Sequence, residues 1–158
     1  MTPSSRLHLP LGEETIVFGI GNCGRSDDGL GWAFLDRVRR EAGFNCPVEY
    51  RYQMQVEDAA LIAGKDRVVF VDSFHGELHG GFEWTTCEAS ELFEFTTHVL
   101  PPGGVMYYCR ELYGRTPQAD VLMIQGKKWG LRNDLTAFAR RNLDAALDDF
   151  SARFLRNG

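Results

Sequence analysis

Residues 15–31, TIVFGIGNCGRSDDGLG, decide the fold, because they join a short apolar run to a glycine-rich turn, two aspartates and a helical pattern. Residues 15–20 are β-branched and aromatic without regular polar alternation, which is typical of a strand buried on both faces of a parallel sheet. Apolar residues then recur every four positions over 30–38, which predicts an amphipathic helix. Asp27 and Asp28 are therefore expected at the carboxyl end of a strand, where open α/β sheets bind their ligands.

A second apolar run, Val68–Val71, ends at Asp72 and repeats this design. Further strands are predicted over 48–54, 82–87 and 121–124, and further helices over 56–62 and 102–112, with a long final helix capped by Asn133 or Asp134. Strands and helices thus alternate along the chain. This order predicts a three-layer α/β/α sandwich with a mostly parallel, twisted sheet of about five strands. One domain is expected over 1–158, with 1–12 as a loose N-terminal arm.

Composition narrows the function classes. The net charge of -5 argues against a nucleic-acid partner, because phosphate binding favours a basic face. No apolar segment is long enough to span a bilayer, and the N-terminus lacks the apolar run of a signal peptide, so no membrane association and a cytoplasmic location are expected. The four cysteines are scattered without a C-x-x-C pair, which is typical of reduced thiols.

The turn at 19–24, GIGNCG, matches the G-x-G-x-x-G pattern of dinucleotide sites. In such sites the following helix N-terminus receives a pyrophosphate, but here Asp27 and Asp28 occupy that position. A carboxylate about 4 Å from a phosphate charge would cost about 4 kcal/mol at an effective dielectric constant of 20. We therefore expect no nucleotide, and a Gly-rich-loop nucleotide-binding enzyme remains only an alternative.

The acids at the two strand ends suggest a metal or acid–base site. Asp28 and Asp72 would repel one another in one crevice unless a cation lay between them or one acid kept its proton. Two carboxylates and one imidazole suit zinc or nickel with open positions, but spacing does not settle which histidine completes the set. In the alternative in which both acids are structural, Asp28 caps a helix and Asp72 forms a hydrogen bond with the backbone of a turn. His75 and His79 are spaced four apart, but their glycine-rich surroundings disfavour the helix that would pair them on one metal.

Nucleophilic catalysis has little support in the sequence. Cys23 and Ser73 lie near the expected crevice, but neither stands in a G-x-S-x-G or similar motif. Both are therefore interpreted as structural, with Cys23 the better minor candidate for a reactive thiol.

The motifs together resemble the nickel-iron hydrogenase maturation endopeptidases. Residues 19–31, GIGNCGRSDDGLG, are similar to the opening G-x-G-N, four residues, D-[DE]-x-x-G of that family, Val71-Asp72 to its second acidic position, and Thr97-His98 to its nearby histidine. Order and spacing agree over nearly the whole chain. One departure is that Tyr52-Gln53-Met54-Gln55 stands where many members carry a D-G-G-T-like loop, so substrate contacts there are expected to differ.

The resemblance implies an α/β/α sandwich with a metal site formed by Asp28, Asp72 and His98. It also implies the activity: an endopeptidase that removes the C-terminal extension of the nickel-loaded hydrogenase large-subunit precursor after nickel insertion. The nickel would be that of the precursor, positioning the scissile peptide and polarising its carbonyl or a water. Asp28 or Asp72 would serve as general base. A noncatalytic metal-binding or partner-binding module is a further alternative.

Overall fold

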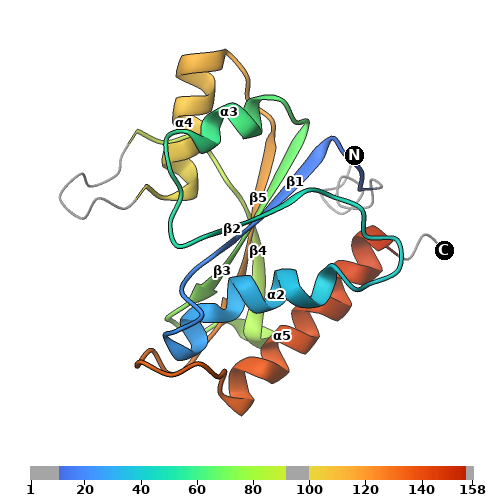
Figure 1. Ribbon diagram of the computed structural model, residues 1–158, viewed down its shortest axis with the longest axis vertical. Coiled ribbons are helices and arrows are strands. Elements are labelled where there is room, and N and C mark those ends of the chain that lie inside the picture. The colour runs from blue at the N-terminus through green and yellow to red at the C-terminus, as the bar shows by residue number, and fades with distance from the viewer. Residues whose placement is uncertain (1–10, 92–99, 156–158) are drawn as a thin grey trace.

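The computed structural model describes residues 11–91 and 100–155, which form a five-stranded sheet with helices on both faces (Figure 1). The strands are β1 (Thr15–Ile20), β2 (Val48–Arg51), β3 (Arg67–Phe74), β4 (Phe82–Thr86) and β5 (Gln118–Gln125). The α-helices are α2 (Leu30–Val38), α3 (Asp58–Ala63), α4 (Pro102–Tyr113) and α5 (Ala137–Phe150). Short helical turns are η1 (Ser26–Gly29), η2 (His79–Gly81) and η4 (Ser151–Leu155). The predicted α/β architecture is confirmed.

The sheet has the order β2-β1-β3-β5-β4. All neighbouring pairs are parallel except β4 with β5, which is antiparallel. The first and third strands are direct neighbours, with Gly19 opposite Val71. The loops that follow β1 and β3 therefore leave the sheet side by side at its carboxyl edge.

Two apolar layers hold the helices against the sheet. On one face, Val17, Val69 and Val71 pack with residues of α2 and α5. On the other, Phe18, Val68 and Phe70 pack with residues of α3 and α4. Alternate residues of β1 and β3 thus serve opposite layers, which explains why these strands are apolar at successive positions.

Several boundaries differ from the prediction. β3 extends through Ser73 and Phe74, beyond the predicted run Val68–Val71 that ends at Asp72, because β5 pairs with it as far as Gln125. β2 ends at Arg51 rather than at Met54. The cap of α5 is Thr136, whose hydroxyl accepts the Ala139 N–H at 3.1 Å, so the prediction of Asn133 or Asp134 was wrong.

The described residues contain no helix long and apolar enough to cross a membrane. All four cysteines are free thiols, as expected; Cys46 and Cys109 are buried, whereas Cys23 is exposed.

Candidate active site

Two of the three predicted site residues lie together at the carboxyl edge of the sheet. Asp28 stands in η1, and Asp72 lies within β3 rather than after it. Ser73 connects them: its backbone N–H donates to Asp72 Oδ1 at 2.8 Å, and its hydroxyl donates to Asp28 Oδ1 at 3.3 Å. In the part of the chain that the structure describes, Asp72 Oδ2 makes no hydrogen bond.

The environment of Asp72 shifts its pKa. Burial, together with the negative charge of Asp28, raises the pKa of Asp72 to about 7, although the hydrogen bond from the Ser73 N–H acts in the opposite direction. Near neutral pH the Asp72 carboxyl therefore exists in both protonation states, which is the condition for exchanging a proton with a reacting group.

The glycine turn is built around Asp28 rather than around an external anion. The N–H of Asn22 lies 3.0 Å from Asp28 Oδ2 and 3.1 Å from the Asp28 carbonyl oxygen, and Gly24 donates to Asn22 Oδ1 at 2.8 Å. Gly21 has φ +140°, and a Cβ there would collide with the Asp28 carbonyl. The turn amides that a pyrophosphate would need are thus used within the loop, which counts against the nucleotide alternative.

Asp27 has a different task from its neighbour. Its carboxylate is fully buried and accepts four hydrogen bonds: from the N–H groups of Lys127, Lys128 and Thr136, and from the Thr136 hydroxyl, at 2.7 to 3.1 Å. Burial alone would raise the pKa of Asp27, but these donors outweigh it and lower the pKa. No sequence pattern indicates these contacts, because the partners lie 100 to 109 residues away and belong to no short motif.

The third predicted residue, His98, lies outside the described residues. Leu100, close behind it in sequence, forms an antiparallel bridge with Met54. Met54 is buried in the layer that faces α3 and α4, where it packs with Phe70 of β3. Leu100 thus lies on the face toward which the alternation of β3 directs Asp72.

The remaining described histidines do not complete a metal site. No group of three His, Cys, Asp or Glu side chains arranged to hold a metal occurs among residues 11–91 and 100–155. His75 instead stacks on Trp129, with ring centroids 3.6 Å apart and planes within 5°. His79 is the first residue of η2, and residues 75–78 before it are not helical, so the helical spacing that would pair it with His75 does not form.

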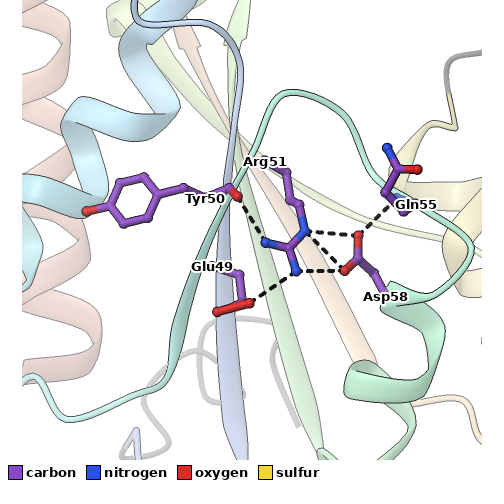
Figure 2. A network of polar contacts seen from close by, with 5 residues as sticks. All are labelled: Glu49, Tyr50, Arg51, Gln55 and Asp58. Atoms are coloured by element: carbon purple, nitrogen blue, oxygen red, sulfur yellow. Dashed lines mark hydrogen bonds and ion pairs between the residues drawn. The ribbon is translucent and has the colours of Figure 1, made fainter.

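The segment after β2 is fixed by a polar network, shown in Figure 2. The Arg51 guanidinium contacts Asp58 Oδ1 at 2.9 Å and Glu49 Oε1 at 3.1 Å, and Asp58 Oδ2 accepts the Gln55 N–H at 2.9 Å. Tyr52 remains 67% exposed and stacks on Trp32, with centroids 5.2 Å apart. The segment that departs from the family pattern therefore presents an aromatic side chain to solvent.

A groove of about 500 Å³ lies next to this aromatic pair. Its lining includes Cys23, Trp32, Tyr50 and Leu135. It runs beside the loop that carries Asp28, because Ser26 and Gly29 also line it.

Comparison with known proteins defines the fold class. No protein-family model and no curated protein matches the chain. Solved structures do match: the chain has the α/β/α fold seen in hydrogenase maturation proteases, as the resemblance predicted.

Two of these structures illustrate the likeness. The NiFe hydrogenase maturation protease HycI from Thermococcus kodakarensis KOD1 has a TM-score of 0.70 and 23% identity, with 90% of this chain and 92% of that chain covered. The hydrogenase maturating endopeptidase HybD from E. coli has a TM-score of 0.67 and 16% identity, covering 87% of this chain and 90% of that chain. The shared fold thus extends over nearly the whole chain.

Proposed function

We propose that this chain is an endopeptidase that removes the C-terminal extension of a nickel-iron hydrogenase large-subunit precursor after nickel insertion. The observation that carries the proposal is the Asp28–Asp72 pair, joined through Ser73 at the carboxyl edge of β3. The fold of the chain, which solved maturation proteases share, supports the same activity.

In this proposal, Asp28, Asp72 and His98 recognise the nickel of the precursor. Carboxylate oxygens and an imidazole nitrogen form a donor set that suits nickel. A cation between Asp28 and Asp72 would also relieve their mutual repulsion. Recognition of the metal would place the scissile peptide beside the acids, and the nickel would polarise its carbonyl or a water.

Asp72 is the better candidate for the general base. Its pKa of about 7 lets it accept a proton from an attacking water at neutral pH and return that proton to the leaving amine. Asp28 accepts hydrogen bonds from Asn22 and Ser73, so its role is to fix the orientation of the pair and contact the metal.

His98 is included because the resemblance to the maturation endopeptidases implies it. It precedes Leu100 by two residues, and two extended residues span at most about 7 Å. Leu100 itself is bridged to Met54, in the layer toward which the alternation of β3 directs Asp72.

The test is incubation of the purified chain with nickel-loaded and nickel-free precursor, followed by mass spectrometry. We expect that only the nickel-loaded precursor, and not the nickel-free one, loses the mass of its extension. Asp28→Asn and His98→Ala should keep their melting temperatures and leave the precursor uncut. Asp148→Asn, which changes an exposed acid on α5, is the matched control and should process normally.

Each other outcome has a defined meaning. Full processing by Asp28→Asn or His98→Ala would refute the assigned roles. Binding of the precursor without mass loss would indicate the noncatalytic alternative. No binding and no cleavage by the unmodified chain would refute the proposal as a whole.

A further inference from the structure

A smaller groove of about 270 Å³ adjoins the first one, because Ser26 and Leu135 line both. Its neutral lining residues include Ser26, Leu135 and Thr136. Its charged lining residues are Lys128, Arg132, Asp134 and Arg140. We call this feature the basic groove.

The groove carries excess positive charge on an acidic protein. Three of its four charged residues are cationic, and its one carboxylate, Asp134, is 3.2 Å from Arg132 Nε. Lys128 and Arg140 form no ion pair with any residue in 11–91 or 100–155. The whole chain has a net charge of -5, so its surface as a whole repels anions. The positive charge of the basic groove attracts them to this one place.

The basic groove is fixed relative to the acidic pair. The Ser26 N–H donates to the Arg132 carbonyl at 2.8 Å, and the Asp27 N–H donates to the Lys128 carbonyl at 3.0 Å. The Ser26 hydroxyl also donates to the Asp134 carbonyl at 3.1 Å. The backbone that supports the groove is therefore bonded directly to the residues before Asp28.

We infer that the basic groove binds an acidic segment of the protein substrate, holding it while a neighbouring peptide bond reaches Asp28 and Asp72. This inference rests on the proposed function and adds the chemistry of the substrate. Carboxylate side chains complement Lys128 and Arg140, and a groove of this size accommodates side chains of one short segment. A nucleic acid fits less well, because the excess charge is confined to one groove.

Kinetics of precursor processing test the inference. The double variant Lys128→Glu/Arg140→Glu should raise KM about fivefold to tenfold at low salt, because rim charges act mainly on encounter and binding, and should leave kcat unchanged. The difference from the unmodified chain should shrink at high salt. Arg141→Glu is the matched control, because this exposed neighbour on α5 does not line the groove, and its KM should not change.

A second measurement separates failure of the inference from failure of the proposed function. Binding of a fluorescein-labelled, glutamate-rich peptide is measured by anisotropy for the unmodified chain and both variants, with a labelled single-stranded oligonucleotide as competitor. Peptide binding that the double variant loses supports the groove even if no precursor is cleaved. Equal KM values in all three proteins, or tighter binding of the oligonucleotide than of the peptide, would overturn the inference.

Discussion

Asp27 and Asp72 belong to neighbouring parts of one sheet edge, yet their environments act in opposite directions. The Asp27 carboxylate is fully buried, but four donors lower its pKa. The Asp72 carboxylate receives one backbone N–H, and burial together with the charge of Asp28 raises its pKa to about 7. The comparison shows that hydrogen-bond donors, rather than burial, decide which carboxylate is structural and which is available for chemistry.

The largest effect should come from removing the structural acid. Asp27→Ala leaves three backbone N–H groups and the Thr136 hydroxyl without their acceptor. We expect a loss of about 3–5 kcal/mol in the free energy of unfolding, measured by urea denaturation at neutral pH. Because the pKa of Asp27 is lowered, its contribution is present above pH 4 and is lost on acidification, so the difference should narrow in strong acid. An unchanged urea midpoint would show that Asp27 does not hold this loop.

For Asp72 we expect the opposite dependence of folding stability on pH. Its pKa is raised to about 7, so the folded state binds a proton more tightly than the unfolded state between about pH 4 and pH 7. The stability from that proton is complete below pH 4 and is lost as the pH rises through 7. Asp72→Asn should therefore be more stable than the unmodified chain at pH 8 by about 4 kcal/mol, and equally stable in acid. If Asp72→Asn were instead less stable than the unmodified chain at pH 8, the ionised Asp72 carboxylate would stabilise the fold, as Asp27 does, and the contrast between the two acids would be wrong.

A smaller loss is expected at Thr136, which connects the Asp27 cluster to α5. Its hydroxyl donates to Asp27 Oδ2 and accepts the Ala139 N–H. Thr136→Ala should cost about 2 kcal/mol of unfolding free energy, through the lost cap and the lost bond to a charged group. Thr136→Ser keeps the hydroxyl and should stay close to the unmodified chain, so equal losses in both variants would contradict this assignment.

The smallest effect is expected for His75, which stacks on Trp129 near the same edge. Because the imidazole is exposed, His75→Ala should cost about 1 kcal/mol or less. Precursor processing should continue at the normal rate. A complete loss of processing would transfer the histidine role from His98 to His75.

Much of this arrangement was predictable from short patterns. The apolar runs of β1 and β3 identify two buried strands. The acid that follows each run lies at the carboxyl edge, which neighbouring parallel strands share. The positions of Asp28 and Asp72 at one edge could therefore be expected. Asp72 lies inside β3 because β5 continues the pairing past it, and no local signal marks that length.

The contacts of Asp27 could not be predicted in the same way. Sequence alone gives adjacent aspartates the same propensities, and only the packing of 127–136 against η1 distinguishes them. The cap of α5 was assigned to Asn133 or Asp134 because these residues have strong capping preferences. Thr136 is the cap instead. Its hydroxyl donates to Asp27 Oδ2 and accepts the Ala139 N–H in the first turn of the helix.

The hydrogen bonds of Asp27 also determine when, during translation, the loop that carries Asp28 can complete its folding. They join residues separated by 100 to 109 positions, so the loop that presents Asp28 receives its final support only after Thr136 has left the ribosome. A nascent chain that ends at β5 contains Asp28 and Asp72 but lacks the residues that bond to Asp27, the neighbour of Asp28. The acidic edge is therefore completed late, when translation has almost finished.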